Sequence, residues 1–70
     1  MKTQKNYKIT LFRENDKNNT YILTEKGFSE EDAIEKAKRI IATIGWWGIL
    51  ETKPIEERMK RIKVLSCVVD

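Results

Sequence analysis

Residues 28–45 form a stretch in which every local signal favours one structure, an amphipathic helix. Ser29 can cap the first turn by accepting a hydrogen bond from the backbone N–H of Asp32. Apolar residues then recur at helical spacing, which predicts one buried stripe along the helix. The stripe comprises Ala33, Ile34, Ala37, Ile40, Ile41 and Ile44. Gly45 can supply a left-handed stop, and together these signals predict a helix over residues 29–44.

The charges of this segment follow the helix dipole, because acidic residues come before basic ones. Two pairs, Asp32 with Lys36 and Glu35 with Arg39, have the favourable i,i+4 order, and each is worth about 0.2–0.5 kcal/mol. Phe28 precedes the cap, where we expect it to pack on the next turn as a hydrophobic staple.

The segments before the helix have the pattern of a β-hairpin. Residues 7–13 alternate between apolar and mostly polar positions, and residues 20–24 are rich in β-prone side chains. The apolar side of the first segment consists of Tyr7, Ile9 and Leu11. The polar run 14–19 suits a turn. Gly27 can adopt a positive φ where the chain enters the helix.

After the helix, residues 46–52 can return as a third strand, and residues 53–59 suit a short helical turn or a structured loop. The β-branched run 61–69 predicts a closing strand. We therefore expect a single α+β domain over residues 1–70, with a small, mostly antiparallel sheet of three or four strands and one helix on one face. The order is ββαβ or ββαββ. The inward strand positions are expected to include Tyr21, Leu23, Val64 and Val68.

One helix cannot cover both faces of a sheet, so the opposite face is expected to be available to a partner. The composition, 40% hydrophobic and 36% charged, suits a soluble globular protein, and no run approaches the ~20 apolar residues of a membrane span. No signal peptide is evident at the polar start, so we expect a cytoplasmic protein. Cys67 is the only cysteine of the chain. It favours a core role in a reducing compartment over a reactive thiol.

Catalysis is not expected. The chain has no histidine, and helix capping and solubility account for most of its carboxylates. The segment from Gly45 to Gly48 lacks the Lys-Ser/Thr of a phosphate-binding loop and the spacing of a dinucleotide motif. We therefore expect no cofactor and no metal.

The candidate partner-binding residues are aromatic and basic. Trp46 and Trp47 are consecutive, so in a strand one faces the helix and the other faces away. The outward ring either lies on Lys or Arg stems or anchors an interface. The basic residues either protect an edge strand or form a docking patch. The candidate set comprises Trp47, Arg58, Lys60, Arg61 and Lys63.

The net charge of +3 permits more than one partner class. The basic residues can steer encounter with an acidic protein surface. Alternatively, they can neutralise nucleic-acid phosphates while aromatic residues stack on bases. The aromatic candidates for stacking are Trp46, Trp47, Tyr7 and Phe12. A third possibility is a self-assembling subunit that pairs through an edge strand.

The layout resembles small phage-encoded accessory proteins, a family that includes a short coliphage inhibitor of host RNA polymerase. The resemblance rests on a hairpin, the helix start at residues 29–37, a Trp-containing turn and the closing strand at 63–68. In that family the sheet and its basic closing strand dock on a polymerase domain. The family has two arginines two apart just before a cysteine, and here Lys63 and Leu65 stand at those places. The resemblance implies a small non-catalytic binding protein, of phage or mobile-element origin, that docks on a host protein and inhibits or modulates it.

Overall fold

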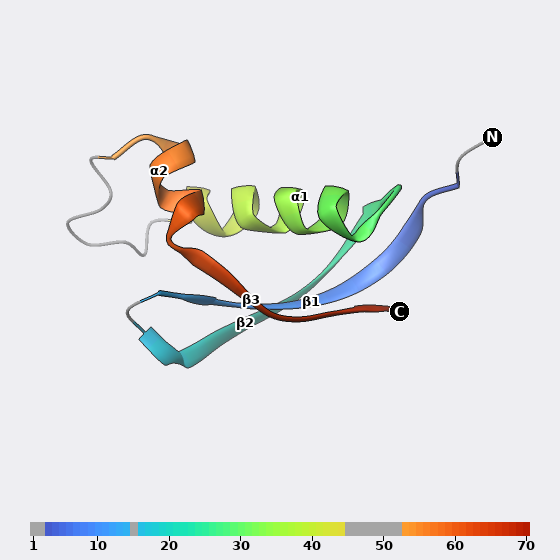
Figure 1. Ribbon diagram of the computed structural model, residues 1–70, viewed down its shortest axis with the longest axis horizontal. Coiled ribbons are helices and arrows are strands. Elements are labelled where there is room, and N and C mark those ends of the chain that lie inside the picture. Colours follow the sequence, from blue (N-terminus) through green and yellow to red (C-terminus); the bar gives the residue numbers. More distant parts are fainter. Residues whose placement is uncertain (1–2, 15, 45–52) are drawn as a thin grey trace.

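The computed structural model describes residues 3–14, 16–44 and 53–70. In chain order, the elements are β1 (Lys5–Arg13), β2 (Asp16–Gly27), α1 (Glu30–Thr43), α2 (Ile55–Lys60) and β3 (Ile62–Val69). The strands form one antiparallel sheet in the order β2-β1-β3, and both helices lie over the same face of it (Figure 1). The predicted α+β class with the order ββαβ is confirmed. The further strand predicted for residues 46–52 lies outside the described residues.

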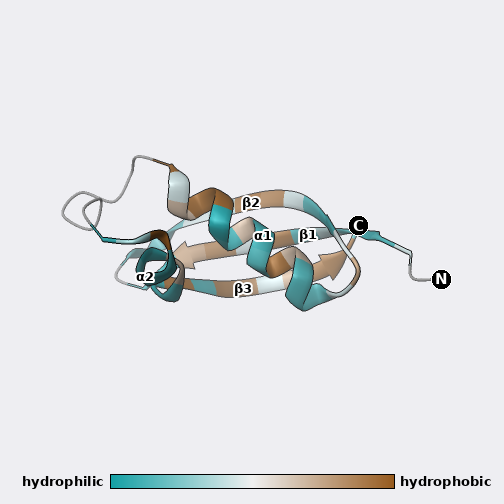
Figure 2. Cartoon of the chain, turned by 90° about the horizontal axis from the view of Figure 1, so that it is seen from above, coloured by the Kyte–Doolittle hydropathy of each residue, from teal (hydrophilic) through white to brown (hydrophobic). Residues whose placement is uncertain are grey.

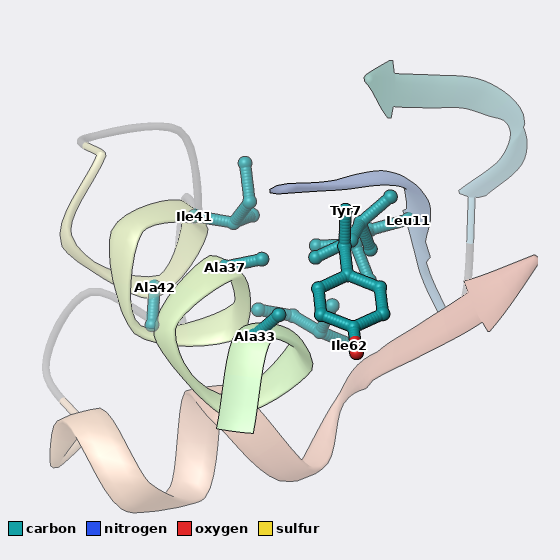
Figure 3. Close-up of a cluster of buried hydrophobic side chains, with 8 residues drawn as sticks. Tyr7, Leu11, Ala33, Ala37, Ile41, Ala42 and Ile62 are labelled. Atoms are coloured by element: carbon teal, nitrogen blue, oxygen red, sulfur yellow. The ribbon is translucent and has the colours of Figure 1, made fainter. Parts of the chain in front are cut away.

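The alternation of β1 places its apolar side against α1. Tyr7, Ile9 and Leu11 are buried, whereas Lys8 is exposed and Thr10 is half-buried. Figure 3 shows Tyr7 and Leu11 facing the helix side chains across the core. The central strand therefore has one face inside the core, and its other face points away from both helices.

The predicted start of α1 is confirmed. The Ser29 hydroxyl accepts from the N–H of Asp32 at 3.2 Å, and the Asp32 carboxylate accepts from the N–H of Phe28 at 3.0 Å. The phenyl ring of Phe28 is mostly exposed, so the expected staple is not a buried contact. The carboxylate of Asp32 also lies 3.5 Å from the Lys36 ammonium. The predicted end agrees with a C-cap at Ile44, and Gly45 lies outside the described residues.

The buried stripe of α1 is narrower than predicted. Ile40 and Ile44 are exposed, while Ala42 is buried although the pattern did not include it. The helix residues in the core are Ala33, Ala37, Ile41 and Ala42, all labelled in Figure 3, where Ala42 lies on the α2 side of the helix. Three of these four residues are alanines, whose small side chains let the helix axis lie close to the sheet. The sheet of three described strands is narrow, so it covers only part of the apolar stripe of α1.

Gly27 has a different role from the one predicted. Its φ lies outside the left-handed range, so a turn conformation does not require glycine there. A Cβ at this position would lie 2.7 Å from the backbone nitrogen of Ala33 and 3.1 Å from its Cα and Cβ. Glycine is therefore required because the end of β2 approaches the first turn of α1 too closely for a side chain.

A bulge in β3 changes which of its residues face the core. The register with β1 shifts between Thr10 and Leu11, which leaves Leu65 as an extra residue in β3. Val64 and Cys67 lie opposite the core residues Leu11 and Ile9, respectively. Val68, predicted to point inward, lies opposite Lys8 on the outer side and is exposed. Strict alternation fails here because the extra residue reverses the parity of the strand.

Candidate interaction surface

The face of the sheet that points away from the helices is uncovered in the described part of the chain (Figure 1). We call it the outer face. It is defined by the residues of β1 that alternate with the buried ones and by their cross-strand partners. These residues are Asn6, Lys8, Thr10, Phe12, Thr20, Ile22, Thr24, Lys26, Lys63, Ser66 and Val68.

The charges of the outer face all have one sign. Lys8, Lys26 and Lys63 come from three different strands and are exposed. No acidic residue occupies an outer position in the described strands. The carboxylate of Glu25, which follows Thr24, belongs to the other side because Glu25 lies opposite Tyr7. The strand positions of the outer face therefore carry positive charge, while the acidic Asp70 and Glu14 lie just beyond the ends of β3 and β1.

Apolar side chains lie among these lysines. Ile22 is 62% exposed and Val68 is 53% exposed. Ile22, on the edge strand β2, lies opposite Thr10 of the central strand, while Val68 lies opposite Lys8. Phe12 is half-buried and lies opposite Lys63. The outer face therefore combines exposed apolar area with nearby cations.

The structure gives two of the predicted basic residues contacts within the fold. Arg58 donates from Nη1 to the carbonyl of Ala42 at 2.7 Å and from Nε to the carbonyl of Lys53 at 3.1 Å. The first contact links α2 to the C-terminal part of α1. Arg61 forms ion pairs with Glu57 at 3.6 Å and with Glu14 at 4.0 Å. Both guanidinium groups therefore help to hold α2 and the start of β3.

The other two predicted bases lie on different sides of the molecule. Lys60 and Met59 of α2 line a shallow groove of about 410 Å³ on the helix side, together with α1 residues that include Ile34. Lys63 lies on the outer face opposite Phe12. The predicted basic set is thus not one patch, and only Lys63 belongs to the outer face.

The aromatic candidates also separate. Tyr7 is buried in the core, so its ring is not available for stacking on a base. Phe12 does lie on the outer face. Trp46 and Trp47 lie outside the described residues. The outer positions of the described strands therefore contain one aromatic ring.

The sequence reasoning missed Lys8, Lys26 and Ile22 as site residues. The signal was present in β1, where Lys8 occupies the side opposite to the buried residues. For Lys26 and Ile22, the pairing register of the hairpin was also needed, because only the register places them on the same face as Lys8. The basic residues that cluster along the chain lie at residues 58–63 instead.

The titratable groups with shifted pKa values belong to the fold. The hydrogen bond from the N–H of Phe28, with the nearby Lys36 ammonium, holds the pKa of Asp32 below its usual value. Burial, together with the Glu30 carboxylate, raises the pKa of the Cys67 thiol. A raised pKa reduces the thiolate fraction and supports the structural reading of this cysteine. Within the described residues, no cluster of three or more potential metal-ligating side chains is present.

No protein-family model, curated protein or solved structure matches this chain. Neither helix of the described part of the chain has both the length and the hydrophobicity of a membrane-crossing segment.

Proposed function

We propose that this chain is a small non-catalytic binding protein whose outer face docks on an acidic surface of a host protein and thereby inhibits or modulates it. The observation that carries this proposal is the pairing of exposed lysines with exposed apolar side chains on a face without acidic residues in the described strands. The lysines of the outer face steer the encounter with an acidic partner, and the apolar side chains supply area that becomes buried on docking.

Two further features support a protein partner. The outer face spans three strands of the sheet, which suits docking by contact over several strands. The phage accessory proteins that the chain resembles use their sheet to dock on a host polymerase domain. A nucleic-acid interface commonly offers several rings on which bases stack, whereas Phe12 is the one aromatic residue at an outer position of the described strands.

The test compares two charge reversals close together in the sequence. Lys63→Glu changes the outer face, while Lys60→Glu makes the same charge change on the helix side, beside the groove. Each variant, tagged in the same way, is used to recover partners from a host lysate with and without nuclease and at two salt concentrations. Binding of the recovered partner to purified protein is then measured.

We expect a stoichiometric protein partner that survives nuclease and is weakened about tenfold by Lys63→Glu, with little change for Lys60→Glu. Binding of the purified partner should weaken as salt rises. Ile22→Glu, on the same face, should also weaken binding, because it places a charge in the contact area. Recovery that disappears with nuclease would favour the nucleic-acid function. Equal effects of the two lysine variants would contradict docking through the outer face.

A further inference from the structure

β3 is an edge strand without the features that normally protect an edge. It lies next to β1, with no further strand beside it among the described residues. Edge strands usually carry charges or proline that discourage pairing with another chain. After Lys63, β3 contains neither. Its exposed apolar residues are Val64, Leu65, Val68 and Val69. The opposite edge, β2, includes Lys17, Glu25 and Lys26, so β3 is the edge more open to pairing.

The hydrogen bonds to β1 identify which backbone groups of β3 are left for a further strand. The N–H of Glu14 donates to the carbonyl of Arg61, and the N–H of Asp70 donates to the carbonyl of Asn6, both at 2.8 Å. Bonded and non-bonded pairs alternate in an antiparallel ladder. The register from these two bonds therefore assigns the non-bonded positions, whose N–H and C=O groups point to the open edge. These positions are Ile62, Val64, Cys67 and Val69.

The bulge makes this set symmetric about the midpoint between Leu65 and Ser66. Outward groups recur every second residue in a regular strand, but here Val64 and Cys67 are three apart because Leu65 is the extra residue. If a second β3 is reversed about the midpoint, Val64 lies opposite Cys67 of the other copy and the bulges coincide. A regular strand placed beside β3 would have its outward groups two residues apart throughout, so its hydrogen bonds could match β3 on only one side of the bulge. The edge is therefore complementary to an identical edge.

The same register places no like charges opposite each other along the strand. Arg61 lies opposite Asp70 of the second copy, and Lys63 lies opposite the uncharged Val68. Both relations occur twice because of the symmetry. Opposite charges across a strand pair are stabilising and like charges are destabilising, so the charge pattern favours this pairing.

The charges of the helices also bear on this antiparallel pairing. α1 begins next to Gly27, which pairs with Lys5, so its acidic first turn with Glu30 and Glu31 lies at the Val69 end of β3. α2 leads directly into β3 and lies at the opposite end (Figure 2). Its last turn is basic. Antiparallel pairing brings the acidic first turn of α1 in one copy toward the α2 end of the other copy, where the basic Arg58 and Lys60 follow the acidic Glu56 and Glu57.

We propose that two copies of this chain associate antiparallel through β3, about a two-fold axis normal to the sheet, to form one six-stranded sheet. The helices of both copies lie on one side of this sheet, and the outer faces of both copies lie on the other. The proposal uses the edge of the sheet and does not rest on the proposed function.

Sedimentation velocity of the full chain over a concentration series tests the dimer under reducing conditions. Val68→Lys places a lysine opposite Lys63 of the second copy and should weaken dimerisation about tenfold. Val68→Glu places the opposite charge there and should strengthen it. Ile22→Lys makes a similar change at an exposed site on β2 and should leave dimerisation unchanged. A wild-type chain that remains monomeric up to about 1 mM, or equal weakening by the two lysine variants, overturns the proposal.

A disulfide trap tests the register independently. Val64→Cys places a second thiol opposite Cys67 of the other copy, at the Cα separation of ~5.5 Å that a hydrogen-bonded strand pair provides and a disulfide accepts. Within one chain the two positions lie opposite Leu11 and Ile9, about 7 Å apart along the strand and at the limit of what a disulfide spans, so covalent dimer is scored apart from oxidised monomer on a non-reducing gel. Mild oxidation should yield a covalent dimer for Val64→Cys and much less for the wild type. Equal yields, or no covalent dimer, contradict the register.

Discussion

Replacing Gly27 by alanine tests whether close packing determines this junction of strand and helix. The added Cβ would lie 2.7 Å from the Ala33 nitrogen and 3.1 Å from its Cα and Cβ. Two of the three contacts are with backbone atoms of the capped first turn, so a side-chain rotation cannot relieve them. We expect Gly27→Ala to destabilise the domain by about 1–3 kcal/mol, the usual range for overpacking.

The expected loss is large for a chain of this size, whose free energy of unfolding is about 4–10 kcal/mol. With a urea m-value of about 1 kcal/mol/M, the midpoint should fall by roughly 1–3 M. Circular dichroism during urea titration measures this shift. Thr24→Ala, at an exposed position of the same strand, should change the midpoint much less.

The sign of the effect distinguishes close packing from backbone freedom. At an ordinary φ with open space around it, alanine would stabilise the protein by about 0.4–1 kcal/mol because it restricts the unfolded chain. A midpoint for Gly27→Ala equal to or above that of the wild type would therefore refute the packing argument. Adding Ala33→Gly removes the Cβ contact but leaves those with the backbone nitrogen and Cα, so the double variant should remain less stable than Ala33→Gly alone.

Three further predictions concern the helices. Ser29→Ala removes the cap of α1 and should cost about 1 kcal/mol in thermal or urea unfolding, whereas Ser29→Thr should retain most of the stability. The pKa of Asp32 is lowered in the folded state; its stabilisation is therefore present above the unfolded pKa, near 3.9, and is lost as pH falls through the folded value. Asp32→Asn should reduce the decline of the urea midpoint between about pH 5 and 2, and an unchanged decline would contradict this origin. Arg58→Met breaks the bond to the Ala42 carbonyl and should cost about 1–3 kcal/mol, while the exposed Lys60→Met should unfold with a nearly unchanged midpoint.

The partner-binding residues illustrate the limits of reading a site from the chain. A cluster along the sequence suggested Arg58, Lys60, Arg61 and Lys63 as one set. In the fold, Arg58 bonds to the carbonyl of Ala42 and Lys60 borders the groove, while Lys63 lies on the outer face. Three-residue spacing in a helix and alternation in a strand send neighbouring side chains in different directions. The role of these residues in binding stays a prediction. Of the four, Lys63 shares the outer face with Lys8 and Lys26.

The sequence by itself determined α1 and the inner side of β1, because their signals are local. The Ser29 cap acts on a group three residues away, and Tyr7, Ile9 and Leu11 alternate within one strand. Only the tertiary structure decided the bulge at Leu65 and the close approach at Gly27. The bulge depends on pairing with β1, which is distant along the chain. The close approach depends on how the end of β2 packs against the first turn of α1. The free energy of packing and of pairing with β1 selects them, and a pattern within a few residues does not contain that information.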